Sequence, residues 1–157
     1  KNYDEWKALA SCHPIKPRLM CEGKSGSAWY VSGGRSTTGK LYADAGANYV
    51  FASYPNAGGV PLSFETVFDK AQDADVWLMK YNHPTDKTYK SLQEDYAPYA
   101  NFKAFKEKNI YHCNTAYRPY YEDFPFHPDR VLKDLIKIFH PSLLPEYELK
   151  YFSKLAE

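Results

Sequence analysis

The seven residues from Gly34 to Lys40 have the types and spacing of a phosphate-binding loop. They read Gly-Arg-Ser-Thr-Thr-Gly-Lys and lie between an apolar run and a helical pattern, as the loop that cradles nucleotide phosphates does. That loop needs Ser or Thr after the Lys to hold magnesium, and the residue here is Leu41. A milder interpretation keeps the helix start as a site for an anionic or polar group, with Arg35 and Ser36 facing a cleft.

The loop from Asn114 to Phe126 is the second candidate, because it combines several aromatic residues with a cation. It follows a predicted strand, and open α/β sheets bind ligands beyond the carboxyl ends of their strands. Tyr117 and Arg118 are therefore predicted to contact a ligand. In the alternative interpretation the rings only seat the loop on the final helix, and this suits the two phenylalanines of the loop better.

Other patterns that would indicate catalysis or a bound metal are absent from the sequence. There is no Gly-x-Ser-x-Gly turn for a nucleophile, and the histidines lack the spacing of metal ligands. Cys12, Cys21 and Cys113 do not make a disulfide framework, and the last two fall in apolar runs typical of buried free thiols. We therefore expect no enzyme activity and no cofactor.

The candidates are positioned by short apolar runs that alternate with helical patterns. The runs are typical of strands and cover residues 18–21, 28–31, 48–51, 76–79 and 110–113. Helices are predicted over residues 2–11, 37–45, 64–71, 89–95, 101–106, 128–139 and 146–155. Ser36 and Ser63 are the expected caps of the second and third helices. The alternation predicts a three-layer α/β lobe, with a mainly parallel sheet of about five strands and helices on both faces.

The composition predicts one globular domain. A chain of 157 residues with 44% hydrophobic residues is long and apolar enough to build a single core. A formal net charge of +1 gives no basic footprint for nucleic acid. No apolar stretch is long enough to span a bilayer, and no signal-peptide pattern is present. Because the chain starts at Lys1 without Met, we expect a processed or truncated product.

Five segments in order carry a family resemblance. They are Trp29-Tyr-Val-Ser-Gly-Gly-Arg-Ser, Tyr42-Ala-Asp-Ala-Gly-Ala-Asn-Tyr, Pro61-Leu-Ser-Phe-Glu-Thr-Val-Phe, Asp73-Ala-Asp-Val-Trp-Leu, and His127-Pro-Asp-Arg-Val-Leu-Lys-Asp-Leu with the later Phe139-His-Pro. Together they resemble the C-terminal lobe of a class III periplasmic binding protein, the substrate-binding subunit of an ABC importer for iron siderophores, haem or cobalamin. The ending Phe139-His-Pro-Ser-Leu-Leu-Pro is similar to that of members from Bacteroides-type bacteria.

The resemblance implies half of a two-lobed protein that holds its ligand between the lobes. Residues 1–17 would be the end of the inter-lobe helix and a linker, and residues 18–157 would be the C-terminal α/β lobe. The N-terminal lobe would be missing from this chain. The implied partners are a membrane permease and a metal-chelate ligand, and the implied location is the periplasm, as a membrane-anchored lipoprotein in the full-length form.

By position, the resemblance implies a cleft wall at the strand ends and in the loops that follow them. The wall residues would be Trp29, Tyr30, Arg35, Ser36, Tyr54, Gly59, Val60, Tyr81, Asn114, Tyr117 and Arg118. Among these, Trp29, Tyr54, Tyr117 and Arg118 are expected to be exposed on one common face of the lobe.

Glu65 lies outside the apolar stripe of its helix and in the first helical turn. One interpretation is a mildly stabilising surface carboxylate, because the helix dipole favours a negative charge there. The resemblance implies a second interpretation, in which Glu65 docks the lobe to arginine residues of the permease. A different class of function also stays open, namely a small nucleotide-binding protein or enzyme that uses the Gly34–Lys40 loop.

Overall fold

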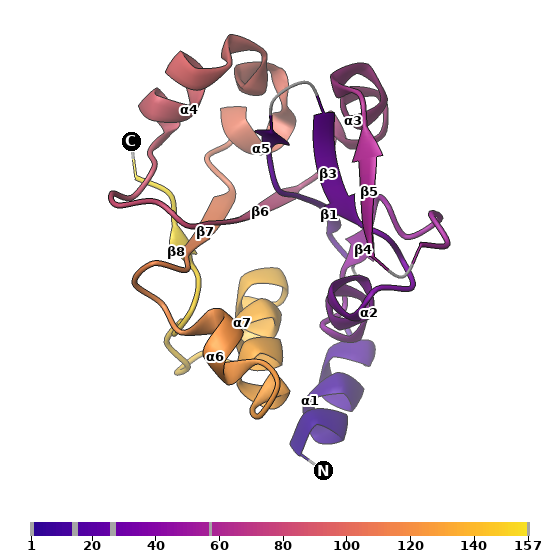
Figure 1. Ribbon diagram of the computed structural model, residues 1–157. Helices are drawn as coiled ribbons and strands as arrows, with labels where there is room; N and C mark the ends of the chain where they lie inside the picture. Colours follow the sequence, from indigo (N-terminus) through magenta and orange to yellow (C-terminus); the bar gives the residue numbers. More distant parts are fainter. Residues whose placement is uncertain (1, 14–15, 26–27, 57, 157) are drawn as a thin grey trace.

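A central sheet of five strands organises the computed structural model, which describes residues 2–13, 16–25, 28–56 and 58–156 (Figure 1). Its strands, in spatial order, are β4 (Asn48–Tyr49), β1 (Arg18–Cys21), β6 (Val76–Tyr81), β7 (Ile110–Asn114) and β8 (Ser153–Lys154). The first four are parallel to one another, and β8 is antiparallel to β7. The predicted α/β class and mainly parallel sheet are confirmed.

Helices cover both faces of this sheet (Figure 1). One face carries α3 (Phe64–Ala71), α4 (Tyr89–Asp95), the 3₁₀ helix η1 (Ala97–Asn101) and α5 (Lys103–Lys106). The other carries α1 (Asn2–Ser11), α2 (Thr37–Asp44), α6 (Tyr120–Asp123), α7 (Pro128–Phe139) and the 3₁₀ helix η2 (Pro141–Leu143). The helices have the caps that the sequence predicts, since Ser36 accepts a hydrogen bond from Gly39 N and Ser63 accepts one from Thr66 N. Within the described residues, no helix is both long and apolar enough to cross a membrane.

The predicted strand at residues 28–31 does not belong to the parallel sheet, which corrects the sequence-based assignment. It is β3 (Ala28–Ser32), the middle of a small antiparallel sheet with β2 (Lys24–Ser25) and β5 (Gly59–Leu62). Burial alternates along it, with Trp29 and Val31 buried and Tyr30 exposed. Such alternation is typical of a strand that has one face on the core and one face open.

The tail from Glu146 to Leu155 is not helical, although its apolar spacing predicts a helix. Asp134, which is fully buried on α7, accepts hydrogen bonds from the backbone N–H groups of Lys150, Tyr151 and Phe152. A helix would use those N–H groups for its own bonds. The buried carboxylate therefore holds the tail extended and leads it into β8.

Part of the core is an aromatic cluster around Trp29 and Trp77, whose ring centroids are 5.8 Å apart. The Trp29 indole N–H donates to Cys21 O at 3.1 Å, and Phe102 packs against both tryptophans. Trp29 has no exposed surface, so the expectation that it faces the cleft is wrong. The prediction of buried free thiols is confirmed for Cys21 and Cys113.

Candidate functional site

The carboxyl ends of the parallel strands form one edge of the central sheet. Strand β1 continues into Glu22, β6 ends at Tyr81 and is followed by the loop at residues 82–88, and β7 is followed by the loop that contains Tyr117. Parallel strands present all their carboxyl ends on the same edge, which is where open α/β sheets bind ligands. Two pockets of similar size lie at this edge.

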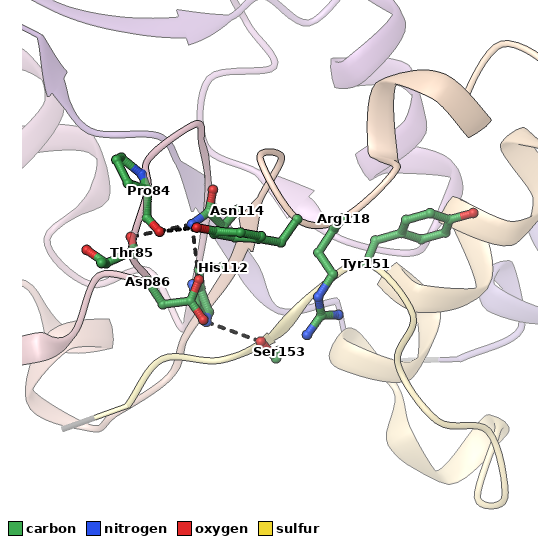
Figure 2. A pocket seen from close by; sticks show the side chains of 9 residues that line it. Pro84, Thr85, Asp86, His112, Asn114, Arg118, Tyr151 and Ser153 are labelled. Carbon is green, nitrogen blue, oxygen red and sulfur yellow. Dashed lines mark hydrogen bonds between the residues drawn. The ribbon is translucent and has the colours of Figure 1, made fainter.

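The first pocket, called here the His112 pocket, has a volume of about 330 Å³ and lies between the loops after β6 and β7. Its lining residues are Pro84, Thr85, Asp86, His112, Asn114, Tyr117, Arg118, Tyr151 and Ser153. Figure 2 shows Pro84, Thr85 and Asp86 on one side, Arg118 and Tyr151 on the other, and His112 and Asn114 between them. Polar groups therefore converge on this space from three segments that are far apart in the sequence.

Most of these polar groups already bind one another. The Asn114 amide nitrogen donates to His83 O and to the Asp86 carboxylate, and its oxygen accepts from two backbone N–H groups. Tyr117 donates its hydroxyl to Pro84 O. Arg118 Nη1 donates to Lys150 O at 2.8 Å. The network ties the two loops and the tail together.

His112 is the centre of this pocket and is itself buried. Lys87 N donates to the Tyr81 hydroxyl oxygen, so we assign the Tyr81 proton to the 2.6 Å bond with His112 Nδ1. In that tautomer His112 Nε2 donates to Ser153 Oγ at 3.1 Å. Burial lowers the pKa of His112 and raises the pKa of Tyr81 to about 12, so both rings are held neutral at physiological pH.

The second pocket, called here the Lys80 pocket, has a volume of about 320 Å³ and lies between β3, β5 and the ends of β1 and β6. Its lining residues are Glu22, Gly23, Tyr30, Val31, Ser32, Gly59 and Lys80. Tyr30 is 53% exposed and forms an open side, whereas the Lys80 side chain is only 7% exposed. This pocket therefore combines an accessible ring with a buried cation.

Lys80 and Glu22 form a loose buried pair in this pocket. Glu22 Oε1 accepts a hydrogen bond from the Lys80 backbone N–H at 3.2 Å, while Glu22 Oε2 lies 3.8 Å from Lys80 Nζ. Burial by itself lowers the pKa of Lys80, but the phenols of Tyr120 and Tyr121 and the Glu22 carboxylate outweigh that effect and raise it. Burial raises the pKa of Glu22, and the nearby ammonium opposes that shift. The ammonium therefore stays charged.

The structure brings the predicted wall residues together in two groups. Tyr30 and Gly59 meet in the Lys80 pocket, and Asn114, Tyr117 and Arg118 meet in the His112 pocket. Tyr54 is half-buried and Arg35 is exposed, and neither lines these two pockets. The hydroxyl of Tyr81 is used by His112 and Lys87, so Tyr81 braces the edge from within.

Three predicted wall residues have side chains that do not face a cleft. Trp29 belongs to the aromatic core, as described above, and Val60 is 7% exposed because it packs inward opposite Val31. Ser36 is 6% exposed, because its hydroxyl donates to Gly33 O and accepts from Gly39 N. These residues build the elements behind the wall.

The glycine-rich turn is filled by the protein's own backbone. A Cβ on Gly34 would lie 2.0 Å from Ala52 O, and one on Gly33 would lie 2.3 Å from Asn56 O. The N–H groups of both glycines donate to carbonyl oxygens of the facing loop, at Gly58 and Tyr54. The residue in the magnesium position, Leu41, is 1% exposed. The geometry therefore favours close packing between two loops over phosphate binding.

The sequence analysis missed Glu22 and Lys80, although both carried a signal. Lys80 is the only charged residue in the apolar strand β6, and Glu22 directly follows the apolar strand β1. A lone charge at the end of a buried strand points to a polar site at the sheet edge. Across residues 2–13, 16–25, 28–56 and 58–156, no group of three or more His, Cys, Asp or Glu side chains could hold a metal ion.

Comparisons with known sequences identify the family of the chain. A family model described as periplasmic binding protein matches residues 2–117. An uncharacterised lipoprotein from Methanocaldococcus jannaschii is 29% identical over 107 residues, which are 68% of this chain and 24% of that protein. The match therefore spans about a quarter of the curated relative.

Solved structures show the same fold. A TroA-like periplasmic binding protein, FepB, from Veillonella parvula matches with a TM-score of 0.74 at 14% identity, over 98% of this chain and 53% of that chain. The periplasmic heme-binding protein RhuT from Roseiflexus sp. RS-1 matches with a TM-score of 0.63 at 19% identity, over 90% of this chain and 52% of that chain. The chain thus spans about half of each solved protein. Because the family model covers most of its length and the fold agrees, the chain belongs to the periplasmic binding protein family.

Proposed function

We propose that this chain is part of the substrate-binding component of an ABC importer, which delivers a metal chelate to a membrane permease. The chelate would be an iron siderophore, haem or a cobalamin-type ligand. The observation that carries the proposal is the placement of both pockets at the carboxyl edge of the sheet, in a chain of the periplasmic binding protein family. A ligand that covers this edge would contact both pockets.

The chain would supply one lobe of a two-lobed protein. Residues 18–157 would be the C-terminal lobe, and residues 1–17 would contain the end of the helix that joins the lobes. The coverage of about half of each matched structure supports this division. The name lipoprotein given to two curated relatives supports a location in the periplasm on a lipid anchor.

The ligand wall would run from the Lys80 pocket to the His112 pocket. Tyr30 and Gly59 would contact the ligand at one end, and Tyr117 and Arg118 would contact it at the other. Tyr117 is 64% exposed, so its ring is available even though its hydroxyl is bonded. Exposed tyrosines suit such a wall because they offer an apolar face and a polar tip.

Glu65 would dock the lobe to the permease. It is exposed in the first turn of α3, and the described hydrogen bonds and ion pairs of that turn involve Ser63 and Thr66. Its charge is therefore available to a partner. Charges at the rim of an interface mainly speed the association of the two proteins and fix their relative orientation, and they add less to the affinity.

Binding assays on the full-length protein test the proposal. We expect at least one of four probes to quench tyrosine and tryptophan fluorescence saturably: a ferric tricatecholate, a ferric trihydroxamate, haem or cyanocobalamin. We expect magnesium-ATP to leave the melting temperature unchanged, since the Gly34–Lys40 loop is packed. Stabilisation by magnesium-ATP without binding of any chelate would contradict the proposal and favour the nucleotide-binding alternative.

A further inference from the structure

We propose that the Lys80 pocket recognises an anionic oxygen of the ligand, with Lys80 as its anchor and Glu22 as the carboxylate that offsets the charge of Lys80. This inference rests on the proposed function and specifies the chemistry of its ligand. It selects chelates that carry a carboxylate or catecholate oxygen over neutral chelates. The proposal rests on three observations about the described residues.

The first observation is that the Lys80 ammonium has no hydrogen-bond acceptor among the described protein groups, although most of its side chain is buried. Its side chain is 93% buried, and it lines the pocket. In the described part of the chain its anionic neighbour is Glu22 Oε2, at 3.8 Å, which is beyond hydrogen-bond distance. An ammonium has three N–H donors, and here the protein's own acceptors leave them available to the pocket. An anionic oxygen in the pocket would accept from them.

The second observation is that Glu22 is held by groups other than the ammonium. Its Oε1 accepts from the Lys80 backbone N–H, and its carbonyl oxygen accepts from the Trp77 indole N–H at 2.7 Å. Its backbone N–H donates to Leu78 O, and its φ of 65° is in the left-handed region. Glu22 is thus fixed by the backbone of β6. Its carboxylate offsets the charge of Lys80 without occupying the ammonium's donors.

The third observation is the aromatic surround of the ammonium. Lys80 Nζ lies 4.9 Å from the ring centroid of Tyr120 and 5.9 Å from that of Tyr121. The rings favour the charged form but accept no conventional hydrogen bond. Tyr121 is 60% exposed, and Tyr30 is 53% exposed on the pocket itself. An anionic group that reaches Lys80 through the pocket would therefore pass the exposed ring of Tyr30, which suits a flat, oxygen-rich chelate.

The direction in which Glu22→Gln changes ligand affinity shows whether the ligand presents an anion to Lys80 or a cation to Glu22. If the ligand presents an anion to Lys80, Glu22→Gln removes a repulsive charge, and affinity stays equal or rises. If the ligand presents a cation to Glu22, the same substitution weakens binding. Lys80→Met removes the anchor and should weaken binding of an anionic chelate about tenfold or more.

Two further variants keep the test valid if Lys80→Met destabilises the fold by leaving Glu22 unpaired. The double variant Lys80→Met with Glu22→Gln removes both charges and should also lose binding of the anionic chelate. Lys87→Met is the matched control, because Lys87 contacts the Tyr81 ring at the same edge without lining the Lys80 pocket. Lys87→Met should change the affinity for the anionic chelate by less than about threefold.

The experiment has two arms on the full-length protein. In the first, citrate without metal is titrated against the wild type and the variants, and the ammonium signal of Lys80 is followed by NMR. We expect a saturable shift that disappears in the double variant. In the second arm, dissociation constants are measured for a ferric tricatecholate, which is anionic, and a ferric trihydroxamate, which is neutral. We expect preference for the anionic chelate, lost in both Lys80 variants.

The two arms of the experiment test separately whether the Lys80 pocket binds an anion and whether the protein binds these chelates. Citrate binding at Lys80 with no chelate bound would support the anion pocket and contradict the transport of these chelates. Equal binding of both chelates that is unaffected by Lys80→Met and by the double variant would overturn the inference and leave the transport function standing. Weaker binding by Glu22→Gln alone would overturn the assignment of Lys80 as anchor. Absence of binding in both arms would overturn both.

Discussion

The His112 pocket and the Lys80 pocket lie at the same edge of the sheet and have nearly the same volume, yet they differ in how their polar groups are satisfied. In the His112 pocket, both ring nitrogens of His112 and all the polar atoms of Asn114 bind other protein groups. In the Lys80 pocket, the described neighbours of the ammonium are a carboxylate at 3.8 Å and the two aromatic rings of Tyr120 and Tyr121.

This difference indicates that the two pockets have different functions at the carboxyl edge of the sheet. The paired donors and acceptors around His112 and Asn114 gain rigidity and offer few groups to a ligand, so this pocket leaves the Tyr117 ring and the remaining N–H groups of Arg118 for one. An ammonium whose N–H donors are not bonded by the described protein groups can bond an anionic group that enters the pocket. We therefore interpret the His112 pocket mainly as a brace with an aromatic rim, and the Lys80 pocket as the place where ligand identity is read.

The largest expected effect comes from breaking the brace at its base, with Asp134→Ala. Asp134 is fully buried and accepts from Tyr147 and from three backbone N–H groups of the tail that lines the His112 pocket. Its removal leaves the backbone N–H groups of Tyr151 and Phe152 buried without partners, which should lower the free energy of unfolding by about 3 kcal/mol. Denaturant unfolding measures the loss. Asp69→Ala, at an exposed position of α3, is the control and should stay within about 0.5 kcal/mol of the wild type.

The next effect compares exposed tyrosines from the two pockets. Tyr30→Ala should weaken binding of whichever chelate the protein takes about fivefold to tenfold, because Tyr30 flanks the Lys80 pocket. Tyr117→Ala should weaken it less than about threefold, because Tyr117 belongs to the rim of the brace. Fluorescence titration gives both constants. A larger loss for Tyr117→Ala would reverse the roles that we assign to the pockets.

A smaller effect is expected on the pH dependence of stability. Burial lowers the pKa of His112, so between that value and 6.5 the unfolded chain binds more protons than the folded one. Stability should therefore fall as the pH drops below about 6.5. His140 is also buried, and burial lowers its pKa as well, so two histidines contribute to this slope.

His112→Gln separates the two contributions. It should reduce the slope of unfolding free energy against pH, and His140→Gln should reduce it by a comparable share. Neither variant should change chelate affinity at pH 8 by more than about twofold, because His112 braces the edge and His140 stacks on His13 away from it. A slope that survives both substitutions would show that other groups carry the pH dependence.

The smallest effect in the purified protein is expected for Glu65→Lys. Chelate affinity and melting temperature should hardly change, because Glu65 is exposed and outside both pockets. Permease binding and uptake in cells should fall, more for Glu65→Lys than for Glu65→Ala, and the permease-binding defect should shrink at high salt. Normal uptake with Glu65→Lys would exclude Glu65 as the docking residue.

The parts of the fold that depend on local pattern were predictable from the sequence. The apolar runs at 76–79 and 110–113 fall in β6 and β7. Ser36 caps α2 and Ser63 caps α3, as their sequence positions predict. The antiparallel β3 was not recognisable in this way, because Trp29, Tyr30 and Val31 form an unbroken apolar run and their alternation in burial is known only from the structure. The resemblance placed Trp29 on the cleft wall by its position at a strand end, whereas its side chain lies in the aromatic core.

The parts that depend on long-range contacts were not predictable in this way. The extended tail is set by Asp134, which lies 16 or more residues before the N–H groups that it accepts from. The Lys80 pocket depends on the pairing of β1 with β6, where Cys21 lies opposite Leu78. That register brings Glu22 beside Lys80, 58 residues away, and a single sequence does not reveal it.

The most direct test of the central claim is hydrogen–deuterium exchange on the full-length protein, with and without a saturating bound chelate. We expect slowed exchange in this lobe to centre on the segments around Glu22, Tyr30, Gly59 and Lys80, with weaker protection near Tyr117. Protection confined to the Gly33–Leu41 turn, or to α1 and α7 on the face of the sheet opposite α3, would contradict the claim that the carboxyl edge of the sheet is the ligand wall.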